Sequence, residues 1–282
     1  ISGMMLITQA YHLIVVFLAL ELMSIPLYIL AGFARPRLDS EEASLKYFLL
    51  GTFSSAFMLY GIAFIFGATH TLSLRDILTS LQAGETNMVL FISGSVMMLV
   101  GFGFKVAAVP FHEWAPDVYQ GSPTSISAFM AVAVKAAGFA VMLRVFLTLF
   151  PTLSADLTPV LWGLSALTMV VGNVLAINQT NLKRLLAYSS IAHAGYLLIG
   201  VVAGTGRGVA AMLIYLLIYA FMQMGAFAVV VLMRRADAIG DELKDLSGLF
   251  ARQPFAAIAM LIFMLSLGGI PPTAGFMGKF WL

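Results

Sequence analysis

The sequence predicts an all-α fold, a polytopic membrane helix bundle with inverted repeats and two broken helices. Three observations predict it. Of the 282 residues, 61% are hydrophobic and only 10% are charged, whereas about 25% are charged in a typical soluble domain. The apolar residues form long continuous runs, and proline interrupts two of these runs. So little charge cannot provide the polar surface of a soluble enzyme, and the composition also excludes a disordered chain.

Composition excludes several kinds of site as well. The sequence has no cysteine, so it has no disulfide framework, thiolate metal site or iron–sulfur ligation. The formal net charge of +2 is too small and too dispersed for nucleic-acid binding. We therefore expect the lipid bilayer to be a partner of the chain and nucleic acid not to be one.

Eight apolar runs are long enough to cross a bilayer, whose apolar core is about 30 Å thick and takes roughly 20 helical residues to span. They are too continuous for the alternating strands of a β-barrel. Residues 1–8 are expected to be the end of a ninth helix, and the apolar end of the chain suggests a piece of a longer protein. The predicted spans are residues 11–33, 44–68, 88–109, 124–150, 159–177, 185–203, 209–233 and 255–282.

Basic residues predict the orientation, because short cytoplasmic loops carry an excess of Lys and Arg. One side is predicted to be cytoplasmic and holds Arg35, Arg37, Lys46, Lys183, Arg184, Arg234, Arg235, Lys244 and Arg252. The other side holds Arg75, Arg144 and Arg207. The longest loop, residues 234–253, mixes both signs of charge and is predicted to form an amphipathic helix on the cytoplasmic side.

Two spans contain helix breaks. Pro110 interrupts the third span, and Pro271 with Pro272 interrupts the eighth, because proline lacks an N–H and displaces the carbonyl one turn before it. Irregular backbone at membrane depth must be buried in protein or line a wet cavity. Paired breaks on oppositely directed segments are typical of inverted-repeat transporters. The alternative interpretation is a pair of packing kinks, but a lysine accompanies each break.

Four charged side chains are predicted to lie within spans: Glu21, Lys105, Lys135 and Lys279. Each would cost about 2.5–3.5 kcal/mol on insertion scales, and such residues mark ion paths by default. Desolvation brings a lysine ammonium closer to releasing its proton, and an approaching carboxylate restores it. We therefore predict a proton relay. The alternatives are a Glu21–Lys105 salt bridge that fixes helix register, and a Lys105 side chain that reaches the membrane interface.

The histidines are less decisive. His193 lies about mid-span beside small residues, so it is either a relay group or an interhelical hydrogen-bonder. His112 follows the first break and either lines a cavity there or caps the turn. His12 and His70 are expected at the membrane interface. We see no histidine pair suited to haem ligation, and we expect no bound cofactor or metal in this chain.

Five runs of residues resemble the antiporter-like membrane subunits of respiratory complex I, and they are most similar to its subunit N group in bacteria. The resemblance covers essentially the whole chain. The runs are residues 18–28 (LALELMSIPLY), 42–51 (EASLKYFLLG), 103–112 (GFKVAAVPFH), 114–123 (WAPDVYQGSP) and 181–196 (NLKRLLAYSSIAHAGY).

The resemblance implies two inverted five-helix repeats, here about residues 1–150 and an incomplete 151–282, within one antiporter-like proton-translocation domain. It implies that Glu21 is the family's essential glutamate and that Lys105 and Lys279 are the lysines of the two broken helices. Lys135 would be the connecting lysine, and His193 matches a histidine of the central polar axis.

The implied function is proton translocation in a bacterial inner (plasma) membrane, coupled to quinone reduction elsewhere in an NADH–quinone oxidoreductase. Other membrane-arm subunits would be partners, and the quinone, flavin and iron–sulfur clusters would belong to other subunits. Two alternatives remain open: a cation/proton antiporter subunit of the multisubunit sodium-exchanger type, and a membrane-bound hydrogenase subunit. An inert helical scaffold would leave the four buried charges unexplained.

Overall fold

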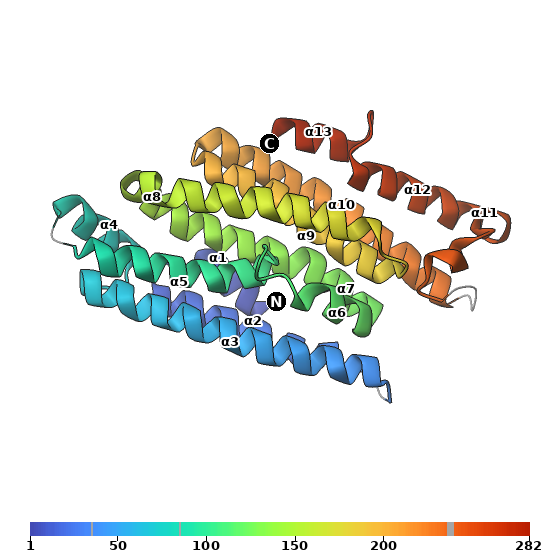
Figure 1. The fold of residues 1–282 in the computed structure, drawn as a ribbon, viewed down its shortest axis with the longest axis horizontal. Helices are drawn as coiled ribbons and strands as arrows, with labels where there is room; N and C mark the ends of the chain where they lie inside the picture. Colours follow the sequence, from blue (N-terminus) through green and yellow to red (C-terminus); the bar gives the residue numbers. More distant parts are fainter. Residues whose placement is uncertain (35, 85, 236–239) are drawn as a thin grey trace.

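A computed structural model describes residues 1–34, 36–84, 86–235 and 240–282, with side chains described in these ranges except at 149–156, 234 and 235. Long helices run side by side in one elongated bundle (Figure 1). The helices are α1 (Ser2–Gln9), α2 (Leu13–Ala31), α3 (Leu38–Thr69), α4 (Leu74–Ala83), α5 (Met88–Val106), α6 (Trp114–Gly121), α7 (Thr124–Phe129), the π-helical turn η1 (Met130–Val134), α8 (Lys135–Ile177), α9 (Leu182–Ala203), α10 (Gly206–Arg235), the 3₁₀ turn η2 (Leu243–Leu246), α11 (Leu249–Arg252), α12 (Pro254–Gly268) and α13 (Ala274–Trp281).

The predicted spans agree with these helices. Within the described residues, seven helical stretches are long and apolar enough to cross a membrane, and they correspond to the first seven predicted spans. The eighth predicted span is the pair α12 and α13, of which Pro254–Gly268 is the apolar arm. The all-α membrane fold is thus confirmed.

Helix α8 crosses the bundle twice. A Cβ atom at Gly138 would lie 3.2 Å from Cγ1 of Val106, and the hydroxyl of Thr168 accepts a 2.9 Å hydrogen bond from the N–H of Val109. Thirty positions of straight helix would separate Gly138 from Thr168 by about 45 Å. Both nevertheless contact the same short segment of chain, so the arms 135–148 and 157–177 lie antiparallel (Figure 1).

Small residues let the second arm of α8 pack closely on α9. A Cβ at Gly172 would lie 2.6 Å from the backbone N of Ala192, and one at Gly195 would lie 2.7 Å from that of Met169. The hydroxyl of Ser165 donates to the carbonyl of Gly195 at 2.8 Å. Such close backbone approach is the usual packing mode of membrane helices. It fixes α9, which carries His193, against α8.

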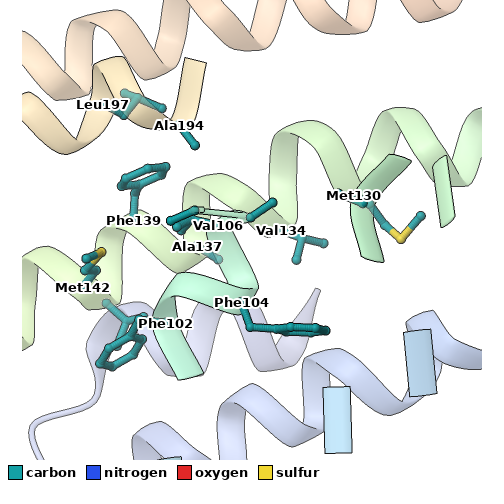
Figure 2. Close-up of a cluster of buried hydrophobic side chains, with 14 of the residues drawn as sticks. Phe102, Phe104, Val106, Met130, Val134, Ala137, Phe139, Met142, Ala194 and Leu197 are labelled. Atoms are coloured by element: carbon teal, nitrogen blue, oxygen red, sulfur yellow. The ribbon is translucent and has the colours of Figure 1, made fainter. Parts of the chain in front are cut away.

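One part of the apolar core lies where α5, α8 and α9 meet (Figure 2). Phe102, Phe104 and Val106 come from α5, and Phe139 and Met142 come from α8. Phe102 lies beside Met142, Phe139 points toward Ala194 and Leu197 of α9, and Phe104 points to the other side, toward α3 (Figure 2). Lys105 is therefore held in a helix end whose neighbours are fully packed.

The loops expected on one side gather at one end of the bundle. The N–H of Leu182 donates to the carbonyl of Asp241 at 2.7 Å, and that of Leu243 donates to Thr180 at 2.7 Å. At the other end, the residues before α2 pair with those before α4 through the bridge His12–Ser73. The grouping of the loops is as predicted. Which end faces the cytoplasm stays a prediction.

The prediction of an amphipathic helix over residues 234–253 is wrong for the described part of that loop. Residues 240–253 form only the short turns η2 and α11. Residues 241–243 use their backbone to pair with the α8–α9 connection, and Gly248 adopts a left-handed φ of +73°. A continuous helix is incompatible with both features. Residues 236–239 lie outside the described residues.

Candidate functional site

The first break lies where Pro110 predicts it. Helix α5 ends at Val106, and Ala107 turns the chain with a left-handed φ of +58°. A cis Val109–Pro110 peptide follows. The N–H of Ala108 donates to the carbonyl of Gly103 at 2.8 Å, and the indole of Trp114, at the start of α6, donates to the carbonyl of Phe104 at 2.9 Å. The carbonyls of Gly103 and Phe104 are therefore hydrogen-bonded inside the protein, as the membrane requires.

The second break joins α12 to α13. Gly269 has a left-handed φ of +78°, and a cis Pro271–Pro272 peptide follows. The ammonium of Lys279 reaches back from α13 and donates to the carbonyls of Leu267, at 2.8 Å, and Gly268, at 3.4 Å. Carbonyls at a helix C-terminus attract a cation. Lys279 thus caps α12 and ties the two halves of the broken helix together.

Lys105 is buried in an aromatic cage. Its side chain is 3% exposed, and its Nζ atom has no hydrogen-bond partner among the described residues. The ammonium lies 5.8 Å from the ring centre of Tyr28, 5.4 Å from that of Tyr47 and 5.7 Å from that of Phe104. Such contacts stabilise a cation only modestly. Lys105 therefore does not reach the membrane interface.

Glu21 lies near Lys105 without pairing to it. The carboxylate is half-buried on α2 and accepts a 2.5 Å hydrogen bond from the hydroxyl of Ser55 on α3. Glu21 and Lys105 do not appear together among the ion pairs of the described residues, although their charges interact. The fixed salt bridge considered above is thus not what the structure shows.

Lys135 is 1% exposed and points away from Lys105. Its ammonium donates to both the carbonyl and the hydroxyl of Ser190 on α9, each at 2.6 Å. The hydroxyl of Tyr219 on α10 also donates to Ser190, at 2.8 Å. The π-helical turn η1 ends immediately before Lys135. A π-helical turn locally alters which way the following side chains face.

His193 lies between Lys135 and Lys279. It is 2% exposed, and its Nδ1 atom shares a 2.5 Å hydrogen bond with the hydroxyl of Tyr215. Its ring centre is 5.1 Å from that of Tyr219 and 5.6 Å from that of Tyr196. The ammonium of Lys279 lies 4.6 Å from the same Tyr196 ring.

The structure thus brings Lys135, His193 and Lys279 into one polar chain with four side chains that we did not predict. These are Ser190, Tyr196, Tyr215 and Tyr219. Tyr215 and Tyr219, both buried, are one helical turn apart in the same predicted span. That spacing was the available signal, since it places two hydroxyl groups on one helix face.

His112 is not part of this chain. Its Nδ1 atom lies 3.3 Å from the carbonyl oxygen of Pro110, which places it within the turn of the first break. The neighbouring Glu113 is exposed and borders a largely apolar groove of about 260 Å³ that is also lined by Pro110 and Phe111. Of the two roles considered for His112, the structure favours the one in the turn.

The structure also contains a cluster of charged residues that we did not predict, at the predicted cytoplasmic end. Asp117 on α6 binds Lys46 of α3 at 2.8 Å and Arg184 of α9 at 2.5 Å. The neighbouring Lys183 is buried and donates to the carbonyls of Gln120 and Ser122 at the end of α6. These contacts fasten α6 between α3 and α9. Within the described residues there is no group of three or more His, Cys, Asp or Glu suited to a metal ion.

Fold and site together define a multi-pass membrane protein whose interrupted helices surround ionisable side chains, an arrangement that is typical of membrane transporters. Residues 10–282 match the family described as NADH:quinone oxidoreductase/Mrp antiporter, TM, and the chain belongs to that family.

Relatives in that family make the likeness closer. The chain is 52% identical to NADH-quinone oxidoreductase subunit N of Trichlorobacter lovleyi, over 99% of this chain and 58% of the relative. It is also 52% identical to subunit N of Chloroflexus aggregans, over 100% of this chain and 58% of the relative. The chain therefore spans 58% of the length of these relatives, and the predicted resemblance is confirmed.

Solved structures agree. Respiratory complex I from Thermus thermophilus with bound aureothin contains a chain 44% identical to this one, with a TM-score of 0.83, covering 99% of this chain and 59% of that one. A chain of the archaeal membrane-bound sulfane sulfur reductase is 27% identical, with a TM-score of 0.91 and coverage of 99% and 57%. A chain of the Mrp complex of Dietzia shares the fold, with 23% identity and a TM-score of 0.84. The match covers 99% of this chain and 52% of that one.

Proposed function

We propose that the chain is the proton-translocating core of a subunit N of a bacterial NADH–quinone oxidoreductase. It would act in the inner membrane, against other membrane-arm subunits, as one part of an enzyme complex. The support is 52% identity to proteins named subunit N and 44% identity to a chain of a respiratory complex I. The quinone, flavin and iron–sulfur clusters would lie in other subunits.

The observation that carries this proposal is the series of polar side chains from the buried Lys135 through Ser190, Tyr219 and His193 to the half-buried Lys279. Lys135 is bound to neutral oxygen atoms. An ammonium in such surroundings has lost most of its hydration, which favours release of a proton. The amine that remains can take up another proton. Arginine is unsuited to this step because it stays protonated.

Glu21 and Lys105 would form the loading end of the relay. In the structure the carboxylate is held by Ser55 and the ammonium lies in its aromatic cage. Movement of Glu21 toward Lys105 would favour the charged lysine, and movement away would favour release of its proton. His193 would pass protons between the hydroxyls of Tyr215 and Tyr219 and Lys279.

We further propose that the chain forms one antiporter-like domain of two inverted repeats, about residues 1–150 and 151–282. The support is the pair of matching breaks. Each contains a left-handed turn residue and a proline, at Ala107 and Pro110 in α5–α6 and at Gly269 and Pro271 in α12–α13.

The sodium-exchanger alternative has weaker support. The Mrp chain is 23% identical to this one, which supports a shared fold and no more. The identities to subunit N are more than twice as high. Proton transport coupled to quinone reduction is therefore the function that we favour.

The decisive test replaces Lys135 with methionine in the full-length subunit, within the assembled complex, and measures NADH-driven proton pumping into sodium-free vesicles. We expect Lys135→Met to lower the pumping rate at least about tenfold, which corresponds to about 1.4 kcal/mol of added barrier. Lys135→Arg keeps the charge but should also fail, because arginine does not release a proton.

The matched control is Lys244→Met, which removes an exposed lysine of the α10–α12 connection and should pump normally. Undiminished pumping in Lys135→Met, at normal amounts of assembled complex, would contradict the proposed function. Pumping that returns only when Na⁺ is added would favour the antiporter alternative.

A further inference from the structure

The ammonium groups of Lys105 and Lys135 point in different directions although their helices touch. A Cβ at Gly138, one turn after Lys135, would lie 3.7 Å from the Cβ of Lys105. Yet the head of Lys105 lies among rings of α2, α3 and α5, whereas the head of Lys135 binds α9. The relay proposed above therefore needs groups that join the two heads.

Three buried polar atoms in the Lys105 cage have no hydrogen-bond partner among the described residues. They are Nζ of Lys105 and the hydroxyl oxygens of Tyr28 and Tyr47. The two tyrosine rings meet edge to face at 4.8 Å, and both face the ammonium. Buried polar atoms are nearly always hydrogen-bonded, and a buried water typically binds two to four such atoms. This cage is therefore suited to hold water.

Helix α6 leads from this cage to Lys135. It packs against both α3 and α9. Tyr47 stacks on Trp114 of α6 at 4.5 Å, and Trp114 meets Tyr119 of the same helix at 5.9 Å. Tyr119 is 1% exposed. Tyr119 lies on α6, which packs against α9, the helix that carries Ser190.

We propose that the hydroxyls of Tyr47 and Tyr119, joined by internal water, carry protons between Lys105 and Lys135. Each hydroxyl accepts a proton from one neighbour as it releases its own to the next, so neither tyrosine becomes charged. The Lys105 ammonium becomes an amine, and an unprotonated Lys135 becomes an ammonium. Ser190 makes the last transfer. This inference rests on the proposed function.

The test uses Tyr47→Phe and Tyr119→Phe in the full-length subunit of the assembled complex. Each substitution keeps the ring and its contact with Trp114 and removes only the hydroxyl. We expect pumping to fall about tenfold in either variant, corresponding to about 1.4 kcal/mol of added barrier. The double variant should be no slower than the singles, because both groups act in one path.

The solvent isotope effect on pumping separates a relay from a structural role. It should increase in both variants because proton transfer becomes rate-limiting, and a packing defect would leave it unchanged. Tyr188→Phe is the matched control. Tyr188 is also buried on α9 but lies beside Arg184, and its variant should resemble the wild type.

Normal pumping and a normal isotope effect in both variants, with Lys135→Met inactive, would overturn this inference and leave the proposed function standing. If Lys135→Met also pumps normally, the proposed function itself is contradicted. If one tyrosine variant does not assemble, the other provides the same test.

Discussion

Two buried lysines show how the same side chain is given different tasks. Lys183 donates to the carbonyls of Gln120 and Ser122 at the C-terminus of α6, where the helix dipole favours a permanent cation. Lys135 donates to the hydroxyl of Ser190, which also accepts a hydrogen bond from the hydroxyl of Tyr219. Hydroxyls both donate and accept, so the second environment can accommodate the ammonium or the amine. Lys135 is the one suited to exchange protons.

The residues predicted from the sequence were the charged ones, because a charge within an apolar run is visible without a structure. Glu21, Lys105 and Lys135 were found in this way, and the structure places all three within the helix bundle. Ser190 and Tyr219 were not found, because serine and tyrosine are ordinary in membrane helices. Which of them meets a lysine depends on how each helix is rotated in the bundle.

Gly51 leaves room for a side chain of the Lys105 cage because it has no Cβ atom. A Cβ atom there would lie within contact of the hydroxyl of Tyr28. We predict that Gly51→Ala displaces Tyr28 and destabilises the folded subunit by about 1–3 kcal/mol, the usual range for overpacking. Differential scanning calorimetry of the purified complex would show this as a lower unfolding temperature.

The control for that substitution lies on the same helix. A Cβ at Gly67 of α3 would meet no atom within 4 Å, so Gly67→Ala should be neutral or slightly stabilising, because alanine favours helix over glycine. Equal losses of stability at the two positions would show that helix propensity, and not the contact with Tyr28, decides the outcome.

At the scale of elements, the two breaks were predictable and the π-helical turn was not. The breaks are visible in the sequence because proline cannot continue a helix, and they contain Pro110, Pro271 and Pro272. The turn Met130–Val134 contains neither proline nor glycine, so its local sequence carries no such signal. It is set by the packing of the surrounding helices. The backbone pairing that replaces a helix at residues 241–243 likewise depends on a partner segment distant in sequence.

A side chain of α8 helps to hold the first break. The N–H of Val109 has its bond to the hydroxyl of Thr168, so Thr168→Val would leave a buried donor unsatisfied. We predict a loss of about 1–3 kcal/mol in stability, measured as thermal inactivation of the assembled complex. Thr148→Val is the control, since that hydroxyl bonds within its own helix to Arg144. A loss no greater at Thr168 than at Thr148 would contradict this view of the break.

Across the whole molecule, the ionisable groups follow the order of the helices. Glu21 lies on α2, Lys105 on α5, Lys135 on α8, His193 on α9 and Lys279 on α13. In Figure 1 these helices follow one another from α2 and α3 at the bottom of the view to α12 and α13 at the top. The polar path therefore runs across the bundle, from helix to helix, and not along a helix axis. Proton movement along it would be mainly parallel to the membrane plane.

We infer that these ionisable groups form one hydrated, continuous path. The most direct test is an experimental map of the assembled complex at a resolution that shows ordered water. We expect water between the Lys105 ammonium and the hydroxyls of Tyr28 and Tyr47, and continuous hydrogen bonds from Ser190 through His193 to Lys279. Ammonium groups turned toward lipid, or apolar side chains packed dry between Lys105 and Lys135, would contradict it.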